Sequence, residues 1–128
     1  MEKEYPHCKI VEGGNNRQES AFIGLNFCPK ETSNILLHDA ARPFITADKI
    51  SESIELLEQY EAVNISIPVS DTTIIANKNI IESIPNRKKV YLSQTPQSFR
   101  YQTILNAHKK FKGSNLTDDI QLVNNLNI

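Results

Sequence analysis

The residues best suited to chemistry stand in one short segment, His38-Asp39-Ala40-Ala41-Arg42-Pro43. Asp39 and Arg42 are three positions apart and directly follow a compact apolar run. A carboxylate in this place can bind a ribose hydroxyl or a metal ion, and the planar fork of Arg42 can hold a phosphate. The same two side chains can instead form an ion pair that fixes the turn. The residues alone leave both interpretations open.

A second candidate is the glycine pair Gly13-Gly14, which stands three residues before Arg17 at the start of a predicted helix. Glycine lets a backbone approach a flat ligand closely, and a helix N-terminus offers free N–H groups. The pair can equally be an ordinary turn. Four further residues lie at predicted element boundaries and can present a hydroxyl or a guanidinium, or serve as caps or surface groups: Thr72, Arg87, Thr95 and Thr117. The basic run 85–89 around Arg87 is either a solvated turn or an attractor of anionic substrates.

Short strands and helices alternate along the chain and must position these residues. Hydrophobic periodicity and Gly/Pro punctuation predict strands over 9–11, 34–39, 62–69 and 90–95, with Pro96 ending the last. They predict helices over 17–27, 47–60, 101–111 and 120–126, and a β-hairpin over 72–81. This alternation predicts an α/β domain with a mostly parallel sheet. Ligands of such sheets bind beyond the carboxyl ends of the strands, which selects Gly13-Gly14, His38-Asp39 and residues 69–72.

Composition restricts the classes of function. The chain has 128 residues, a single-domain length, and its 14 basic and 15 acidic residues give a net charge of -1. This balance argues against nucleic-acid binding, and no apolar run approaches the ~20 residues of a membrane span. The opening residues after Met1 do not resemble a secretion signal. Two cysteines without a CxxC spacing and three scattered histidines favour reduced thiols in a cytoplasmic protein without structural zinc.

Five motifs in series resemble the cytidylyltransferases that make CDP-alcohols, namely the 2-C-methyl-D-erythritol 4-phosphate and ribitol 5-phosphate enzymes. The resemblance covers about residues 9–126 and implies a Rossmann-like three-layer nucleotidyltransferase fold. In this fold a mostly parallel sheet carries a protruding β-arm, at about residues 70–90 of a partial domain 1–128 that is incomplete at both ends. The motifs are Gly13-Gly14-x-x-Arg17-Gln18-Glu19-Ser20, His38-Asp39-Ala40-Ala41-Arg42-Pro43-Phe44, Pro68-Val69-Ser70-Asp71-Thr72, Gln94-Thr95-Pro96-Gln97-Ser98-Phe99 and Thr117-Asp118-Asp119.

The resemblance also implies a role for each matching residue. The cytosine base is held by Gly13, Gly14 and Ser20. Asp39 and Ala40 lie near the CTP ribose and the metal-bound phosphates, with Asp39 as the Mg²⁺ ligand. The acceptor phosphate pocket comprises Arg42, Thr72, Arg87, Thr95 and Thr117. Catalytic roles fall to Arg87, Thr72 and Asp39. The arm that carries Thr72 and Arg87 reaches into a second subunit, which implies a homodimer.

The reaction implied by the resemblance is attack of a polyol phosphate on the α-phosphorus of CTP, giving a CDP-alcohol and pyrophosphate. Such enzymes serve isoprenoid synthesis, or cell-wall and capsule synthesis. Residues 84–87, Tyr91 and residues 94–99 look slightly more like the ribitol-phosphate branch. We therefore narrowly expect ribitol 5-phosphate as the acceptor over 2-C-methyl-D-erythritol 4-phosphate.

The sequence departs from the family pattern in one respect. Family members open with a glycine-rich loop that cradles the triphosphate, and no G-x-G-x-x-R segment occurs in these 128 residues. The chain also ends soon after Thr117-Asp118-Asp119. We therefore expect a partial enzyme that is marginally stable and inactive alone. The alternative is a non-catalytic truncated remnant that acts as a dimerisation or ligand-binding module.

Overall fold

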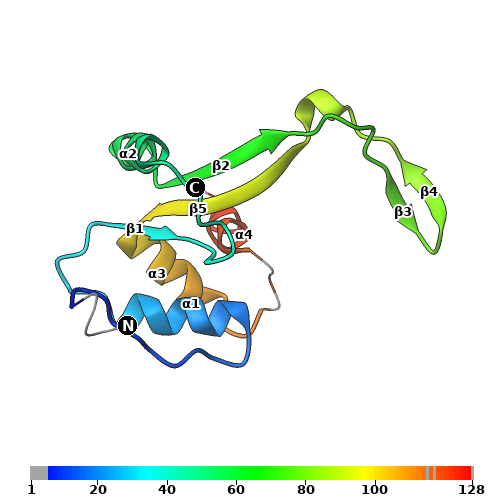
Figure 1. Ribbon diagram of the computed structural model, residues 1–128. Helices are drawn as coiled ribbons and strands as arrows, with labels where there is room; N and C mark the ends of the chain where they lie inside the picture. The colour runs from blue at the N-terminus through cyan, green and yellow to red at the C-terminus, as the bar shows by residue number, and fades with distance from the viewer. Residues whose placement is uncertain (1–5, 115, 117, 128) are drawn as a thin grey trace.

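The structure is a computed structural model that describes residues 6–114, 116 and 118–127. Helices and strands alternate along the chain, and one hairpin protrudes from the body (Figure 1). In chain order the elements are α1 (Arg17–Asn26), β1 (Asn34–Leu37), α2 (Ala47–Leu56), β2 (Ala62–Pro68), β3 (Ile75–Asn77), β4 (Ile80–Ser83), the 3-10 turn η1 (Arg87–Lys89), β5 (Tyr91–Arg100), α3 (Tyr101–Lys110) and α4 (Asp119–Asn124). None of the described helices is long and apolar enough to cross a membrane.

The central sheet has the strand order β1-β5-β2, and β5 runs antiparallel to both neighbours. The α/β class is confirmed, but the expected mostly parallel pairing is wrong for the strands described here. The reason is the connection between β2 and β5, which runs out along the protruding hairpin and back instead of through a crossover helix. β1 and β2 run in the same direction but do not pair, because β5 lies between them. Residues 9–11, predicted as a strand, form no ladder with the described residues.

β5 continues four residues beyond Pro96, where the sequence predicted it to end. Asn64 of β2 pairs with Gln97, and Ser66 pairs with Ser93. Residues 94–96 of β5 therefore stand opposite Ile65 of β2 in an irregular step of the ladder. A bulge of this kind accommodates proline, which lacks a backbone N–H for a regular ladder. The strand can thus carry Thr95 and Pro96 to the end of β1.

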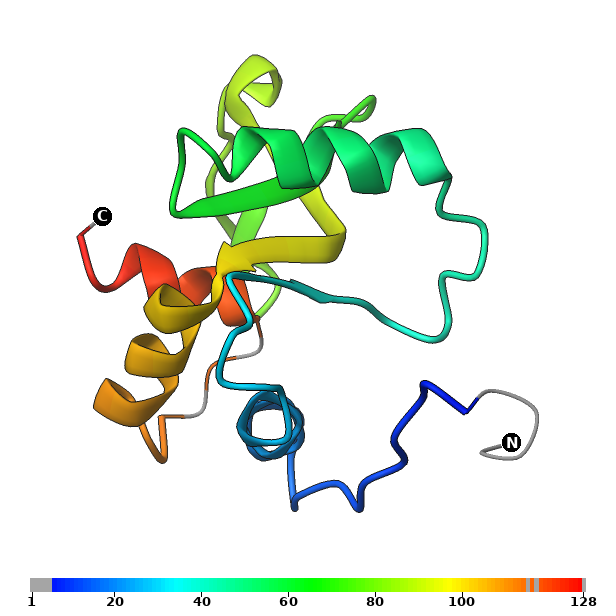
Figure 2. The same cartoon turned by 90° about the vertical axis from the view of Figure 1, so that its left-hand side faces the viewer.

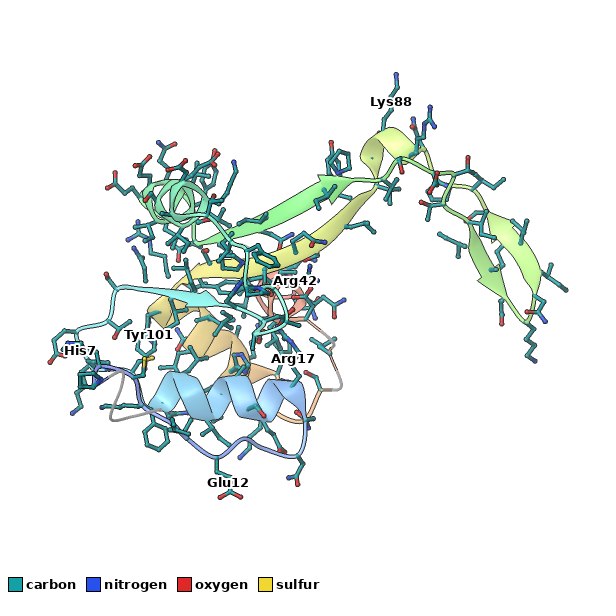
Figure 3. The ribbon with its side chains drawn as sticks, in the orientation of Figure 1. His7, Glu12, Arg17, Arg42, Lys88 and Tyr101 are labelled. Carbon is teal, nitrogen blue, oxygen red and sulfur yellow. The ribbon has the colours of Figure 1, made fainter. Side chains whose placement is uncertain are left out.

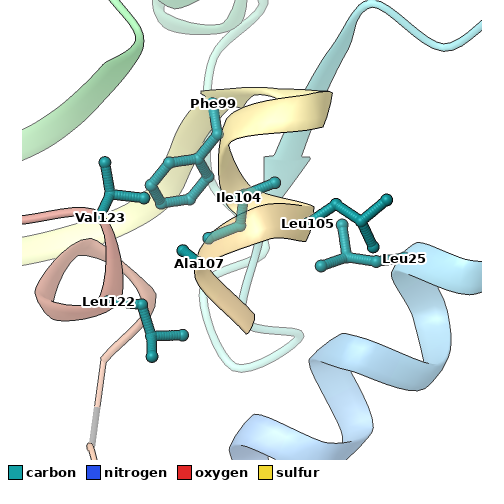
Figure 4. Packing of buried hydrophobic residues seen from close by; sticks show 7 residues of the cluster. All are labelled: Leu25, Phe99, Ile104, Leu105, Ala107, Leu122 and Val123. Atoms are coloured by element: carbon teal, nitrogen blue, oxygen red, sulfur yellow. The ribbon is translucent and has the colours of Figure 1, made fainter. Parts of the chain in front are cut away.

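Helices cover both faces of the sheet, with α2 on one side and α1, α3 and α4 on the other (Figure 2). The core lies between β5 and the second group of helices. Its seven buried apolar side chains come from α1, β5, α3 and α4, and Figure 4 shows them packed together: Leu25, Phe99, Ile104, Leu105, Ala107, Leu122 and Val123. The core thereby holds α1, α3 and α4 against β5.

The protruding hairpin, β3 and β4, forms where the sequence predicted one, and we call residues 70–90 the arm. Its turn is made by Lys78 and Asn79, whose φ angles are 47° and 67°. Two successive positive φ values are those of a type I′ turn, whose twist matches that of a two-residue hairpin. Every residue of both strands is exposed in this chain. The arm therefore contributes nothing to the core described above.

Candidate functional site

The end of β1 is joined to β5 through the hydroxyl of Thr95. The backbone N–H of Asp39 donates to Thr95 Oγ1 over 3.1 Å, and Thr95 Oγ1 lies 3.0 Å from His38 Nδ1. His38 Nε2 lies 2.9 Å from the carbonyl oxygen of Arg42. These contacts are satisfied together when the hydroxyl donates to Nδ1 and His38 carries its proton on Nε2. The buried Thr95 and the His38 ring thus set the course of the loop that presents Asp39 and Arg42.

Asp39 and Arg42 form an ion pair, with 3.3 Å between Arg42 Nε and Asp39 Oδ2, and both side chains are 42% exposed. Arg42 Nη1 also donates to Gln94 Oε1 on β5. An exposed pair of this kind stabilises a fold by only about 0–1 kcal/mol. The ion-pair interpretation of the sequence is therefore confirmed, and the pair remains weak enough for an anionic ligand to compete for the guanidinium.

A pocket of about 370 Å³ adjoins this ion pair. Its polar side is lined by Arg42, Gln94 and Thr95, and its apolar side includes Phe44 and Ile65. A phosphate beside Arg42 would thus have an apolar wall opposite it. Phosphate esters of small polyols combine these features, a charged group and a carbon chain.

The glycine loop is closed onto the first turn of α1. Gly14 N–H donates to Ser20 Oγ over 3.0 Å, and Ser20 Oγ donates to the Asn16 carbonyl over 2.9 Å. Asn16 Oδ1 caps the helix by accepting from Glu19 N–H over 2.9 Å, and Glu19 Oε2 accepts from Asn15 N–H over 2.8 Å. A Cβ on Gly14 would lie 2.3 Å from Glu19 Cβ. Glycine is therefore required by close packing of the loop on the helix.

A line of contacts joins the glycine loop to the end of β1. Arg17, the first residue of α1, pairs with Asp119, the first residue of α4. Its neighbour Asp118 accepts from Ser93 Oγ over 3.3 Å. On β5, Ser93 immediately precedes the glutamine that binds Arg42. In Figure 3 the labelled Arg17 and Arg42 lie on the same side of the molecule. The fold thus brings the two sequence-predicted regions to one edge.

Asp119 is buried, with a side chain 1% exposed, and two cations or donors face it. Its Oδ1 lies 3.0 Å from His108 Nε2, and its Oδ2 binds Arg17. Burial acts to raise the pKa of Asp119, but the hydrogen bond from His108 and the charge of Arg17 outweigh burial, so the pKa lies below its ordinary value. Asp119 is therefore ionised at neutral pH and holds α1, α3 and α4 together.

The two predicted site residues of the arm lie apart from this cluster. Thr72 and Arg87 are exposed near the base of the arm, and Arg87 Nη1 donates to the Ser70 carbonyl over 3.2 Å. Within the described residues neither side chain forms a hydrogen bond with Asp39 or Arg42. The hydrogen bond of Arg87 ties the outgoing and returning limbs of the arm together. Within a single chain, Thr72 and Arg87 therefore lie apart from the other residues of the predicted pocket.

The remaining predicted residues are placed as follows. Ala40 lies in the exposed turn between Asp39 and Arg42. A Cβ on Gly13 would lie 3.0 Å from Ser20 Oγ, so Gly13 belongs to the same closed loop as Gly14. Thr117 lies outside the described residues. The roles of Ala40, Gly13 and Thr117 therefore stay predictions.

Asp39 is the carboxylate that the sequence assigned to a metal ion. The described residues contain no group of three or more His, Cys, Asp or Glu side chains placed to hold a metal. A single carboxylate nevertheless fits Mg²⁺, which commonly takes one or two protein carboxylates and completes its coordination with substrate phosphates and water. Asp39 Oδ1 accepts no hydrogen bond from the described residues, and the Asp39 side chain is 42% exposed, so this oxygen offers such a ligand.

Sequence reasoning missed the contacts that join these regions. His38 and Gln94 occur in the motifs without an assigned role, and so do Arg17 and Asp119. Arg17 and Asp119 are 102 positions apart, and no local pattern pairs them. The sequence predicts that Asp118 and Asp119 both lie in the first turn of a helix, where acidic charge is favourable. Asp119 does lie there, but Asp118 is the N-cap, and the pattern does not reveal Arg17 as the partner of Asp119.

The sheet with helices on both faces and the polar edge beyond β1 define an α/β nucleotidyltransferase-like fold. A family model described as IspD: 2-C-methyl-D-erythritol 4-phosphate cytidylyltransferase matches residues 2–127, and the chain belongs to this family.

Individual relatives agree with this assignment. The chain is 42% identical over 120 residues to the 2-C-methyl-D-erythritol 4-phosphate cytidylyltransferase of Clostridium botulinum (strain Langeland / NCTC 10281 / Type F), covering 91% of this chain and 52% of that protein. It is 37% identical over 124 residues to the protein of the same name from Clostridioides difficile (strain 630), covering 95% and 52%. The chain thus spans about half the length of the curated relatives it matches.

Solved structures show the same fold. The 4-diphosphocytidyl-2C-methyl-D-erythritol synthase of Anaerococcus prevotii DSM 20548 superposes with a TM-score of 0.85 at 31% identity, over 93% of this chain and 54% of that one. The 2-C-methyl-D-erythritol 4-phosphate cytidylyltransferase of Thermus thermophilus gives a TM-score of 0.81 at 29% identity, over 95% and 64%.

Proposed function

We propose that this protein transfers a cytidylyl group from CTP to 2-C-methyl-D-erythritol 4-phosphate and releases pyrophosphate. The observation that carries the proposal is the Asp39–Arg42 pair held by Thr95 and Gln94 beside a pocket of about 370 Å³, in a chain of this family. The narrow preference for ribitol 5-phosphate finds no support in the names of the relatives, which specify the methylerythritol compound. Ribitol 5-phosphate remains the second acceptor to test.

The proposed reaction joins two anions. An oxygen of the acceptor phosphate attacks the α-phosphorus of CTP, the new P–O bond forms, and the bond to the β-phosphate breaks as pyrophosphate leaves with the electron pair. Protein groups contribute mainly by positioning the anions and by offsetting their charge. When bound at Asp39, Mg²⁺ supplies further neutralisation of the triphosphate.

The roles proposed for the residues are those that the resemblance to the family implies. Gly13, Gly14 and Ser20 form the closed loop that receives the cytosine base. Asp39 and Ala40 face the ribose and phosphates, and Arg42, Thr95 and Thr117 hold the acceptor phosphate. We further propose that Thr72 and Arg87 complete the site of a second copy in a homodimer. Their separation from Asp39 within one chain supports this arrangement.

Pyrophosphate release tests the proposal directly. CTP and Mg²⁺ are supplied with either 2-C-methyl-D-erythritol 4-phosphate or ribitol 5-phosphate. The assay uses this chain and, in parallel, a chain extended to the length of its curated relatives with their N- and C-terminal segments. We expect turnover of the methylerythritol compound by the extended chain. Faster turnover of ribitol 5-phosphate would overturn the acceptor assignment. No turnover of either compound would favour a dimerisation or ligand-binding module.

A further inference from the structure

Three helices meet at the buried carboxylate of Asp119. His108 projects from α3 and places Nε2 3.0 Å from Asp119 Oδ1, with both side chains 1% exposed. The other carboxylate oxygen binds Arg17 at the first position of α1. The reaction proposed above makes no use of His108. A buried histidine in this place therefore calls for a reason other than contact with substrate.

The surroundings of His108 fix how its ring is used. Nδ1 is buried and has no hydrogen-bond partner among the described residues, so the proton that the ring donates lies on Nε2. The ring of Phe22 stacks on His108 with 5.8 Å between centroids and 18° between planes. Phe22 therefore packs against one face of the imidazole, whereas the Nε2–H bond sets the orientation of the carboxylate.

Arg17 links the Asp119 carboxylate to the glycine loop. Arg17 directly follows Asn16, whose carbonyl accepts from Ser20 Oγ and whose side chain caps α1. Ser20 Oγ in turn accepts the Gly14 N–H over 3.0 Å. A carboxylate that rotated away from Arg17 would free the first turn of α1 from α4. The glycine loop would then lose its anchor to α4, and Gln18, which donates to the Phe111 carbonyl over 3.0 Å, would remain the polar tie of this turn to the end of α3.

We propose that His108 is a positioning residue for the nucleotide site: it orients Asp119, which holds Arg17 and thereby keeps the loop 13–20 in its closed form. The identity of the nucleotide rests on the proposed function, but the effect of His108 on the loop does not. A purely structural histidine would contribute packing to α3 and would affect the stability of the whole protein without a specific effect on this loop.

Two substitutions separate the hydrogen bond from the packing. His108→Leu replaces the imidazole with an apolar side chain of similar bulk that has no hydrogen-bond donor. His108→Gln retains an N–H donor near the place of Nε2. Phe22→Leu is the matched control, because it removes the stacked ring and leaves the bond between His108 and Asp119 in place. Each protein is first checked by urea unfolding, so that loss of fold is measured separately.

The readouts are the exchange rate of the Gly14 amide proton by NMR and the affinity for CTP by calorimetry. We expect His108→Leu to speed Gly14 exchange and to weaken CTP binding about tenfold, the effect of losing one hydrogen bond to a charged group. His108→Gln should stay within about threefold of the unmodified protein on both. In Phe22→Leu, the ratio of the Gly14 exchange rate to the exchange rate of amide protons in the core of α3 should equal that in the unmodified protein.

Three results would overturn the inference. They are unchanged Gly14 exchange in folded His108→Leu, Gln as harmful as Leu at position 108, and Phe22→Leu matching His108→Leu. If His108→Leu does not fold, Asp119→Asn takes its place, because it removes the charge that holds Arg17 and must accelerate Gly14 exchange. If the unmodified protein binds no CTP, the proposed function fails, and the Gly14 exchange still decides the role of His108.

Discussion

Asp39 and Arg42 hold each other weakly at the end of β1, because both side chains are 42% exposed to water. Their value lies in position, since Thr95 and His38 fix the loop while the ion pair stays accessible. A ligand phosphate therefore needs to displace only a solvated pair to reach the guanidinium. Thr95 and His38 therefore build the loop, whereas Asp39 and Arg42 would bind the ligand. Substitutions can test this division of roles.

Substituting Arg42 should affect activity far more than stability. Arg42→Ala should lower kcat/KM for the acceptor by about 10- to 100-fold, the cost of a lost charged hydrogen bond, and should change the unfolding free energy by less than about 1 kcal/mol. Pyrophosphate release by the extended chain and urea unfolding measure the two effects. Lys49→Ala is the matched control, because Lys49 and Glu52 form another exposed pair at the same spacing on α2. Equal activity of the two variants would remove Arg42 from the site.

Acid should destabilise the protein through Asp119. Its pKa lies below the ordinary value of 3.8, against burial, because His108 and Arg17 favour the ionised form. The folded state therefore binds a proton at this carboxyl more weakly than the unfolded chain does. The stabilisation is complete above about pH 3.8 and is lost as the pH falls through the lower folded pKa.

Urea unfolding from about pH 5 to about pH 2 measures this dependence. The unmodified protein and Asp119→Asn should differ most at the upper end, and the difference in unfolding free energy should shrink below about pH 3.8, where Asp119 becomes protonated in the unfolded chain. A difference that stays constant over the whole range would show that Asp119 contributes no pH-dependent stability.

At the scale of elements, two glycines of the α1 region have opposite requirements. A Cβ at Gly14 would overlap Glu19 Cβ at 2.3 Å, and Glu19 is part of the helix and has little room to move. Gly24 lies within α1, and a Cβ there would meet no atom within 4 Å. Gly14→Ala should therefore destabilise by about 1–3 kcal/mol and weaken CTP binding. Gly24→Ala should stabilise by about 0.5–1 kcal/mol, because alanine favours the helix.

Urea unfolding and CTP calorimetry of both variants check this pair. They share the same chemical change, so any general effect of an added methyl group appears in both. Unchanged CTP affinity in Gly14→Ala would mean that the loop does not hold the base. A destabilised Gly24→Ala would mean that α1 packs more tightly than the structure indicates.

Local patterns were sufficient to predict most elements. Apolar spacing placed α1 and α3 within one or two residues of their observed ends, and the hairpin followed from its short polar turn. Features that depend on partners were not predictable. The strand expected at 9–11 has no neighbour to pair with in the described residues, and β5 passes Pro96 because β2 accommodates a bulge there. On α2, Ser53 is buried whereas Ile54 is 42% exposed, so burial on this helix does not follow residue type alone.

In the candidate site, too, local motifs were predictable and contacts between distant residues were not. His38, Asp39 and Arg42 are close in sequence, so their shared loop was visible as a motif. The pairing of Arg17 with Asp119 depends on how α1 and α4 pack, and sequence spacing carries no information about a contact across 102 positions. Antiparallel pairing of β5 was hidden for a related reason, because the arm replaces the crossover that a helix would have made.

At the scale of the whole molecule, the arm exposes apolar surface that one chain leaves uncovered. Five isoleucines along it are about half or more exposed: Ile74 49%, Ile75 50%, Ile80 71%, Ile81 55% and Ile84 62%. Figure 1 shows the arm extending away from the body, so the helices of its own chain do not cover it. Exposed apolar side chains gathered along one protruding arm mark an interface, and the proposed homodimer supplies a second copy to cover them.

The dimer should therefore dissociate when charge is placed on the arm. Ile80→Glu combined with Ile81→Glu would bury two carboxylates at the interface, and the desolvation of unpaired charge opposes association. Sedimentation velocity should show a dimer for the unmodified protein and a monomer for the double variant. Because both residues are exposed within one chain, urea unfolding of the monomer should change by less than about 0.5 kcal/mol per substitution.

Phe27→Glu is the control, since Phe27 is 55% exposed on the body of the protein and away from the arm. It should leave the dimer intact, which separates an effect of the arm from a general effect of added charge. A monomeric unmodified protein, or a double variant that still sediments as a dimer, would contradict the role of the arm. Because Thr72 and Arg87 act in trans in the proposed dimer, dissociation should also abolish pyrophosphate release by the extended chain. If the monomers retained full activity, Thr72 and Arg87 would have no role in the site of a second subunit.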